Sequence, residues 1–224
     1  MAFLFVLEKN SMSDLIIRQL AAGPLQANAY LLWLEGRDDC CMIDPGDDYA
    51  GLEAAISEAG KRLTDILLTH GHFDHILAAA PLAKAHSARI HIHPCDAHML
   101  KVQGASLYNP SWCQLPFEPV EADEPYPAGN ADWTLSVCGI DFTGFNTPGH
   151  TPGSVCLLNE ANKVLFTGDT LFAFSYGRTD FPGGSDEEMA ASLTRLLGMD
   201  RSLTVYSGHG EADSMDAIAR RWRR

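Results

Sequence analysis

The stretch "DILLTHGHFDH" (residues 65–75) places three of the chain's nine histidines and an aspartate directly after a short apolar run. Such a run predicts a buried strand, and polar residues that follow buried strands lie together at one edge of an α/β sheet, where ligands usually bind. A single histidine is more often an ordinary surface or core residue, and histidine-rich runs also come from purification tags. This run is internal and has the spacing His-x-His-x-Asp-His, so we interpret four residues as candidate metal ligands: His70, His72, Asp74 and His75.

Three further metal-type residues each follow an apolar stretch elsewhere in the chain. His150 lies in "FNTPGHTPGS", Asp169 in "LFTGDT" and His209 in "VYSGHG". Glycine lies close to each of them and allows the backbone to bend sharply and to approach a neighbour closely. Taken singly, Asp169 is as well explained by a turn or a helix cap, and either histidine by an ordinary loop position. Together with the histidine run, they make seven nitrogen and oxygen ligands at predicted strand ends.

Seven ligands fit two cations that share one carboxylate, because each ion then has three ligands of its own and the bridge. Imidazole with carboxylate and no thiolate suits zinc, iron or manganese, and we expect two divalent ions, zinc foremost. Two cations lower the pKa of a shared water toward neutrality and stabilise the oxyanion that forms when a carbonyl is attacked. The pattern therefore predicts a hydrolase that attacks its substrate with metal-bound hydroxide.

Length and composition limit the other possibilities. The chain has 224 residues and no apolar run that reaches the roughly 20 residues of a membrane helix. Its formal charge of −13 disfavours a nucleic-acid partner, and only the tail "RRWRR" is strongly basic. Six cysteines without a C-x-x-C pair are expected to be buried free thiols. We therefore expect a small-molecule substrate, no membrane partner, and either a monomer or a homodimer.

The chain is expected to form one domain, residues 12–224, after an N-terminal extension at residues 1–11. The start of the chain resembles a signal sequence only faintly, because it lacks a basic first part, its apolar core is short, and Glu8 and Lys9 follow too early. Met12 is as plausible a natural start as Met1. We therefore predict a cytoplasmic location.

The hydrophobic pattern alternates between strands and helices. Strands are predicted at residues 28–33, 40–44, 65–68 and 89–94, and at "WTLSVC", "IDFTGFN", "SVCLL", "KVLFTG" and "LTVY". Helices are predicted at residues 49–59 with Gly60 as the cap, from about 74 to 84, after the capping box Ser185-x-x-Glu188, and at the basic end of the chain. Residues 101–129 fit neither pattern, and an irregular stretch of this length is typically functional or mobile.

In their order along the chain, these motifs resemble those of the metallo-β-lactamase superfamily from about Asn28 to His209. The resemblance implies an α/β fold of the αββα sandwich type, in which two mixed β-sheets are flanked by helices. It also implies a metal site at the edges of the sheets.

By position, the resemblance also implies a role for each candidate ligand. The first metal would be held by His70, His72 and His150, and the second by Asp74, His75 and His209. Asp169 would bridge the two ions, and Asp74 and Asp169 would be the catalytic carboxylates. Asp44, in "IDPG", would support the ligands without contacting a metal itself.

Within the superfamily, "GDTLFAFSYGRTDFPGG" (168–184) resembles the glyoxalase II branch, the hydroxyacylglutathione hydrolases, in a short form without their C-terminal helical domain. This resemblance implies hydrolysis of a thioester such as S-lactoylglutathione or a related small acyl-thiol, whose thiolate leaves without a dedicated acid. Arg178 lies where that branch places a basic residue near the substrate, and an ion pair with Asp180 explains it equally well. Tyr176, Tyr108 and Trp112 are further candidate substrate-binding residues, with core or dimer packing as the alternative.

Other branches and functions remain as alternatives. Persulfide dioxygenases share "GRTDF" and a similar ligand set but use one iron and dioxygen, which makes them the principal alternative. Acyl-homoserine lactonases share the seven ligands and are less favoured. Class B β-lactamases usually have a cysteine ligand or lack the bridging aspartate, and RNA-processing members need a basic surface that this chain lacks. A non-catalytic binding module is disfavoured because the ligand set is intact.

Overall fold

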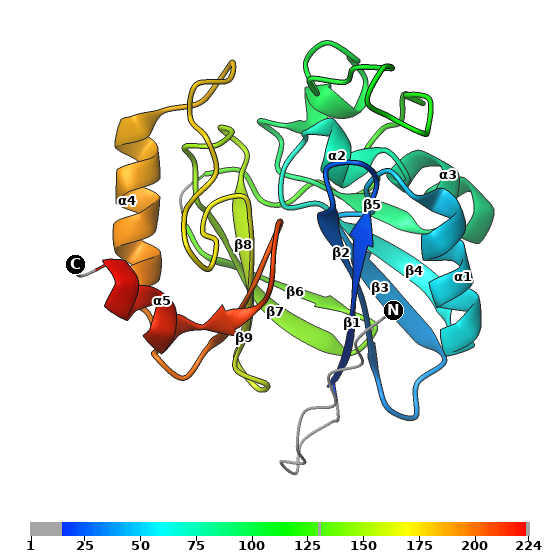
Figure 1. The fold of residues 1–224 in the computed structure, drawn as a ribbon. Helices are drawn as coiled ribbons and strands as arrows, with labels where there is room; N and C mark the ends of the chain where they lie inside the picture. Colours follow the sequence, from blue (N-terminus) through cyan, green and yellow to red (C-terminus); the bar gives the residue numbers. More distant parts are fainter. Residues whose placement is uncertain (1–14, 130, 223–224) are drawn as a thin grey trace.

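Short apolar runs form the strands of two sheets in this computed structural model, which describes residues 15–129 and 131–222 (Figure 1). The first sheet has the order β1-β2-β3-β4-β5. Its strands are β1 (Leu15–Ala22), β2 (Ala27–Leu34), β3 (Asp39–Ile43), β4 (Arg62–Leu67) and β5 (Arg89–His91). The pairs β1–β2 and β2–β3 are antiparallel, whereas β3, β4 and β5 run parallel. The carboxyl ends of β3 and β4 therefore lie at the same edge.

The second sheet has the order β11-β10-β9-β8-β7-β6 and is also mixed. Its strands are β6 (Trp133–Val137), β7 (Ile140–Asn146), β8 (Val155–Asn159), β9 (Val164–Gly168), β10 (Thr204–Ser207) and β11 (Asp213–Ser214). Only the β9–β10 pair is parallel among these described strands. Since β7 also runs in the direction of β9, the residues that follow β7, β9 and β10 come together at one edge.

Helices cover the outer face of each sheet. Figure 1 shows α1 (Tyr49–Ala59) and α3 (Ala79–His86) beside the first sheet, and α4 (Asp186–Leu197) and α5 (Met215–Trp222) beside the second. Leu52 and Leu82 pack in one apolar cluster with Met42 of the first sheet, and Met189 and Ile218 pack in another with residues of the second. The layers are helix, sheet, sheet, helix, which confirms the αββα sandwich expected from the sequence.

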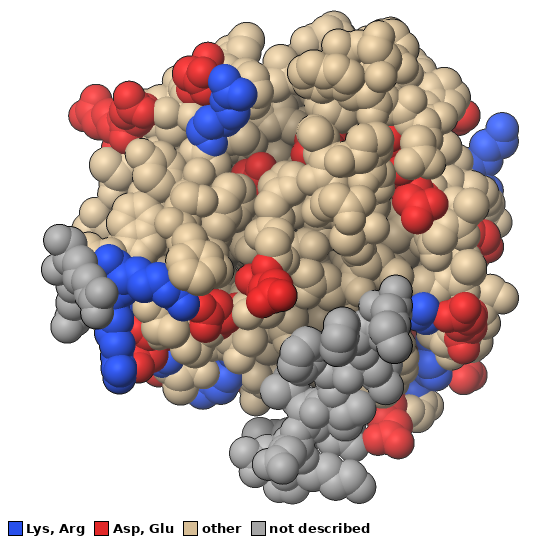
Figure 2. All heavy atoms as spheres, viewed as in Figure 1, with Lys and Arg blue, Asp and Glu red and all other residues tan. Residues whose placement is uncertain are grey.

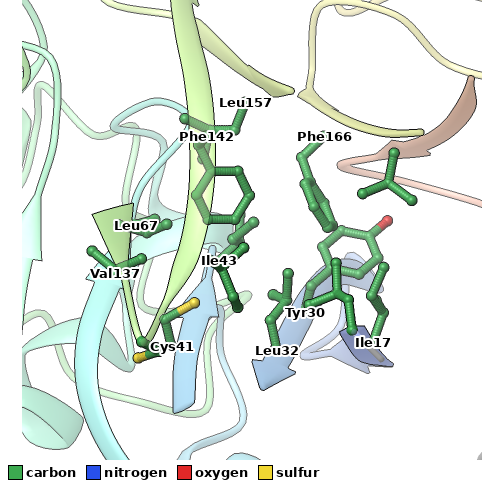
Figure 3. Packing of buried hydrophobic residues seen from close by; sticks show 14 of the residues in the cluster. Ile17, Tyr30, Leu32, Cys41, Ile43, Leu67, Val137, Phe142, Leu157 and Phe166 are labelled. Carbon is green, nitrogen blue, oxygen red and sulfur yellow. The ribbon is translucent and has the colours of Figure 1, made fainter. Parts of the chain in front are cut away.

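A third apolar cluster fills the space between the sheets. Tyr30 and Leu32 of β2 face Phe142 of β7 and Phe166 of β9 (Figure 3). The ring of Tyr30 meets that of Phe166 edge-to-face, with the centroids 5.2 Å apart. Interiors packed at crystal-like density resist sliding, so this cluster sets the position of one sheet relative to the other.

Backbone hydrogen bonds also join the two sheets at the edge where the candidate ligands lie. The N–H of Val155 in β8 donates to the carbonyl of Thr69, which follows β4, at 2.9 Å. The N–H of Asn28 in β2 donates to the carbonyl of Gly208, which follows β10, at 2.7 Å. Each bond connects a strand of one sheet to a loop of the other. The loops of both sheets are therefore held against each other at this edge.

The ends of two helices confirm the caps that the sequence predicted at Gly60 and Ser185. Gly60 ends α1 in the left-handed conformation, with φ of 63°. The hydroxyl of Ser185 accepts the N–H of Glu188 at 3.2 Å and so caps the first turn of α4. The eight-residue β1 was not predicted, because polar and apolar residues do not alternate cleanly in "LIIRQLAA". Its full-length pairing with β2 decides its conformation.

The single helix predicted from about residue 74 to 84 is wrong, because the chain forms two short helices there. The helix α2 (Phe73–Ile76) ends before α3 begins at Ala79. Between them, the N–H of Ala78 donates to the carbonyls of Pro45 and Gly46, at 3.0 and 3.1 Å, instead of continuing the first helix. Pro81, which lacks an N–H, then lies in the first turn of α3, where none is needed. The break allows α2 to point into the site while α3 packs on the sheet.

Three further expectations concern the N-terminal extension, residues 101–129 and membrane-spanning helices. The proposed extension at residues 1–11 lies outside the described residues. Residues 101–129 contain only turns and the irregular backbone expected for them. Across 15–129 and 131–222, no helix combines the length and the apolar character needed to cross a bilayer.

Replacing Phe166 by Ala tests the packing between the sheets. We expect the free energy of unfolding to fall by about 3–5 kcal/mol, because the change leaves a cavity in a fully buried site. Urea denaturation followed by circular dichroism measures it. As a control, Leu25→Ala, at a side chain that is 44% exposed, should change stability by less than about 0.5 kcal/mol. Equal stability of the two variants would contradict the packing described.

Candidate metal centre

Seven side chains from four connections meet at the edge where the sheets join. The connection after β4 provides four of them, the turn after β7 provides one, and the residues after β9 and β10 provide one each. In chain order these are His70, His72, Asp74, His75, His150, Asp169 and His209. The structure therefore brings together every residue that the sequence suggested as a metal ligand.

The first group consists of His70, His72 and His150. Each offers a ring nitrogen, and the three atoms lie within 4.8 Å of one another. Nδ1 of His72 lies 2.8 Å from Nε2 of His150. All three side chains are buried. Three imidazoles around one point are a ligand set that zinc accepts in catalytic sites.

The second group consists of Asp74, His75 and His209, whose ligand atoms also lie within 4.8 Å of one another. Oδ2 of Asp74 is 3.5 Å from Nε2 of His75 and 3.3 Å from Nε2 of His209. The side chain of His75 is fully buried, whereas that of His209 is 28% exposed. This group therefore lies closer to solvent on the side of His209.

Asp169 lies between the two groups. Its Oδ1 is 3.5 Å from Nε2 of His75, and its Oδ2 is 3.5 Å from Nε2 of both His150 and His209. A Cβ atom at position 208 would lie only 2.1 Å from Oδ1 of Asp169, so this approach requires Gly208. The carboxylate is thus placed where a ligand shared by two ions would lie.

Asp44, directly after β3, fixes the orientation of two of the imidazoles. Its carboxylate accepts the N–H and the hydroxyl of Thr69, at 2.7 and 2.6 Å, and Nδ1 of His75 lies 3.1 Å from Oδ2. A carboxylate only accepts, so His75 donates from Nδ1, and Nε2 is the nitrogen that can bind a metal once it has lost its proton. The Thr69 hydroxyl has donated its proton to Asp44, so it accepts from Nδ1 of His70 at 3.1 Å. Nε2 of His70 is left free in the same way.

The geometry also places Asp44 close enough to His70 and His75 to form a third potential ion-binding group. Both of its oxygens are already engaged by hydrogen bonds, which makes it a support for the ligands rather than one of them. Its backbone has φ of 49°, an unusual value for a residue with a side chain and one that costs free energy. Pro45 follows it and restricts the backbone further. The structure tolerates this strain at the residue that orients the site.

A backbone carbonyl orients His150 in the same way. Nδ1 of His150 donates to the carbonyl of Arg178 at 2.7 Å. Because a carbonyl can only accept, Nε2 of His150 carries the lone pair that faces His72 and Asp169. Three of the imidazoles therefore present Nε2 to the same region.

Several of these atoms are buried and have no hydrogen-bond partner among the described residues. They are Nε2 of His70, His72 and His75 and Oδ1 of Asp169. Buried polar atoms are almost always paired, so Nε2 of His70 and Oδ1 of Asp169, with Nε2 of His75 once it has lost its proton, call for a cation. Burial and the neighbouring imidazoles lower the pKa of His70 well below its usual value and that of His72 to about 3, which keeps both rings neutral at neutral pH. The donor set therefore fits divalent metal ions.

The carboxylates of Asp74 and Asp169 favour the protonated form of the histidines beside them, unlike the surroundings of His70 and His72. Burial alone would lower the pKa of His75 and His209, but Asp74 and Asp169 outweigh it and raise these pKa values to about 9 and about 10. Burial would likewise raise the pKa of Asp169, but the charge of His75 and the hydrogen bond from His209 hold it well below its usual value. The site therefore favours positive charge beside its carboxylates.

Two residues that support the site were not recognised from the sequence. Thr69 precedes the histidine run but had no assigned role. Asp96, fully buried, accepts the N–H groups of Gly71 at 3.1 Å and Gly153 at 2.8 Å and the hydroxyl of Thr151 at 2.6 Å. It thereby connects the loop of His70 to the loop of His150. In "HPCDAHML" it reads as an ordinary turn residue, and no sequence signal marked it.

The candidate substrate residues lie on two segments around the centre. The hydroxyl of Tyr108 donates to the carbonyl of Leu115 at 3.2 Å, and its ring lies 6.5 Å from that of Phe73. Trp112, on the same segment, is 57% exposed. Tyr176 lies on the segment after Asp169 and is partly exposed. None of these positions tests the substrate role, which stays a prediction.

Arg178 forms the ion pair that the sequence offered as an alternative to substrate binding. Its guanidinium makes two hydrogen bonds of 2.6 Å with the carboxylate of Asp180 and lies 4.0 Å from the centre of the Phe181 ring. The ring of Phe181 in turn lies 5.6 Å from that of His72. Arg178 is thus close to the first group of ligands, with its charge already paired.

Comparison with known proteins identifies relatives along most of the chain. A family model described as the metallo-beta-lactamase superfamily matches residues 22–209. The chain is 34% identical over 194 residues to the probable metallo-hydrolase YqgX of Bacillus subtilis, covering 86% of this chain and 89% of the relative. It is 31% identical over 198 residues to the hydroxyacylglutathione hydrolase GloC of Haemophilus influenzae, covering 83% and 86%.

Solved structures share the same architecture. The B3 metallo-beta-lactamase BLEG-1 is 32% identical, with a TM-score of 0.81 over 90% of this chain and 95% of that chain. TTHA1623, solved in a di-iron-bound form, is 35% identical, with a TM-score of 0.78 over 90% and 96%. A relative of this size and fold is thus known with two iron ions.

Replacing Asp44 by Asn tests its role in orienting the ligands. The amide replaces one acceptor oxygen by an NH2 group, which must face either the N–H of Thr69 or the two donors at Oδ2, so we expect zinc affinity to fall about 10- to 100-fold. Competition with a fluorescent chelator measures this affinity. Asp47→Asn is a matched control, because Asp47 is equally buried but accepts from the N–H groups of Gln114 and Leu115 instead. Equal affinity in both variants would contradict the assignment.

Zinc binding should release protons from His75 and His209. Their raised pKa values of about 9 and about 10 mean that both are protonated at neutral pH and must lose the proton to coordinate. We therefore expect about two protons to be released per chain at pH 7 and the apparent affinity to rise with pH. Calorimetry in buffers of different ionisation enthalpy measures the number. Binding heats that do not depend on the buffer would contradict it.

Proposed function

The chain belongs to the metallo-beta-lactamase superfamily, and from this premise we propose that it is a binuclear metal-dependent hydrolase of small thioesters. One observation carries the proposal: nitrogen and oxygen ligand atoms from both sheets converge, and several of them are buried without a hydrogen-bond partner among the described residues. The superfamily, the ligand clusters and the related metallo-hydrolase support the general class of activity. The substrate is the further step that we propose here.

The proposed ligand assignment follows the two groups and the carboxylate between them. His70, His72 and His150 would hold one ion, Asp74, His75 and His209 the other, and Asp169 both. When bound, divalent ions supply a water that is nucleophilic at neutral pH and a positive charge that stabilises a developing oxyanion. Zinc is our first choice, and the di-iron relative keeps iron as the alternative.

The chain's own residues would contribute orientation and proton transfer. Asp44, through Thr69 and His75, and the carbonyl of Arg178, through His150, hold the imidazoles in one tautomer each. Asp74 is buried, and its histidine neighbours hold its pKa below the usual value despite burial. Its carboxylate is therefore ionised at neutral pH, and while one oxygen would hold a metal ion, the other could accept a proton from an attacking water.

The thioester substrate is supported by the segment after Asp169 and by the relative GloC. GloC is named a hydroxyacylglutathione hydrolase, and residues 168–184 of this chain resemble that branch. A thioester suits a site without a dedicated acid, because a thiolate is a good leaving group. We propose S-lactoylglutathione or a related small acyl-thiol as the substrate.

Two other activities remain as candidates. A mononuclear iron persulfide dioxygenase is the alternative suggested by "GRTDF", and a lactonase is less favoured. The structural similarity to BLEG-1 also favours testing a β-lactam, although the sequence argued against this class. We further propose a cytoplasmic protein that acts on a small molecule and binds neither nucleic acid nor membranes.

Metal analysis paired with a substrate panel tests the function. We expect two ions per chain, thiol release from S-lactoylglutathione by the zinc-loaded protein, and no oxygen uptake with glutathione persulfide. Asp169→Asn should lower thiol release by a factor of about 100 or more, because it weakens the shared ligand. Iron-dependent oxygen uptake without thiol release from any thioester would establish the dioxygenase instead. Faster turnover of a chromogenic cephalosporin than of thioesters would establish a β-lactamase.

A further inference from the structure

Arg221, near the end of the last helix, holds the segment that follows Asp169. Its guanidinium donates to the carbonyl of Ala173 and forms an ion pair with Asp213. The same group lies 4.2 Å from the centre of the Phe174 ring. The planar fork of arginine can make two hydrogen bonds and stack on an aromatic ring at once, which lysine cannot. Arg221 therefore joins the segment at residues 172–176 to α5.

This segment carries three aromatic rings, at Phe172, Phe174 and Tyr176, which alternate along the chain after Asp169. The ring of Phe172 meets that of His209 edge-to-face, with the centroids 5.9 Å apart. Phe174 is 80% exposed, although large apolar side chains are rarely so open to solvent. The ring of Tyr176 lies 5.6 Å from that of Trp222, the last residue of α5. The row of rings thus begins beside a candidate ligand and ends on α5.

The turn itself is short and well defined. The N–H of Phe172 donates to the carbonyl of Ser175 at 2.8 Å, and the N–H of Gly177 donates to the carbonyl of Asp169 at 2.9 Å. The first bond folds the segment onto itself, and the second joins its end to Asp169, the residue that lies between the two ligand groups.

Positive charge gathers at the same place on an otherwise acidic molecule. Figure 2 shows blue side chains beside the C-terminal end of α5 on this face. Arg220 is paired with Asp216, four residues earlier, and is largely exposed. Arg221, its neighbour, is the one that turns toward the aromatic segment. The two arginines therefore differ in contact but not in charge.

We propose that Arg221 is a positioning residue for a substrate-binding wall formed by Phe172, Phe174 and Tyr176 beside His209. Phe172, beside His209, would lie nearest the reacting bond, and Phe174 and Tyr176 would contact the apolar part of a thioester farther from it. Arg221 touches neither the candidate ligands nor the substrate, and acts by holding the Ala173 carbonyl and the Phe174 ring. This inference rests on the proposed thioester hydrolysis.

The test compares Arg221→Ala with Arg220→Ala, which removes the same charge from the adjacent position. We expect Arg221→Ala to raise KM for the thioester about tenfold with kcat within about twofold, because a mobile wall weakens binding without removing a reacting group. Hydrogen exchange at residues 172–177 should become faster in this variant, with metal content unchanged. Arg220→Ala should change neither KM nor the exchange rates.

A second variant keeps the proposal testable if Arg221→Ala does not fold. Phe174→Ala removes an exposed ring but leaves the hydrogen bond of Arg221 to Ala173 and its ion pair with Asp213, so it should raise KM with an unchanged melting temperature. Unchanged KM in Phe174→Ala, or an exchange rate at residues 172–177 that Arg221→Ala does not alter, would overturn the proposal. A wild-type protein that releases no thiol would refute the thioester function and the substrate role of the wall together. The exchange rates alone would then decide whether Arg221 fixes the segment.

Discussion

The candidate metal centre depends on the hydrogen bonds that the carboxylate of Asp44 accepts. It accepts from Thr69 and faces Nδ1 of His75, and through the Thr69 hydroxyl it also determines which nitrogen of His70 carries the proton. One acceptor thereby fixes which nitrogen of two ligands faces the metal site, one ligand from each group. A positive φ before a proline is a costly conformation, and it is retained where the backbone must turn this carboxylate toward the ligands.

The second constraint is that the two sheets must hold their loops in fixed positions relative to each other. The apolar cluster between them sets their relative position, and the bond from Val155 to Thr69 joins the loop after β4 to the opposite sheet. Asp96 adds a buried connection, because one carboxylate accepts N–H groups from the loops of His70 and His150. Ligands that are far apart in sequence can therefore stay within a few ångströms without depending on a metal to draw them together.

The fold and the convergence of the candidate ligands were predictable because both follow from repeating local rules. Apolar runs marked the strands, and polar residues just after them had to share an edge, which is why His150, Asp169 and His209 were found. The break between α2 and α3 was not predictable, since it depends on hydrogen bonds from Ala78 to the distant residues Pro45 and Gly46. Asp96 was missed for the same reason, because its partners come together only in the folded chain.

The charges of the site residues determine what a bound metal ion would contribute to this protein. The ionised carboxylates of Asp74 and Asp169 require a positive partner in a buried site, and the raised pKa values of His75 and His209 show that protons can meet this need. Small zinc domains fold only with their metal because they have little core. Here three apolar clusters supply the core independently of the centre. Metal ions would therefore exchange with protons in a site that is already built, and contribute to the chemistry rather than to the fold.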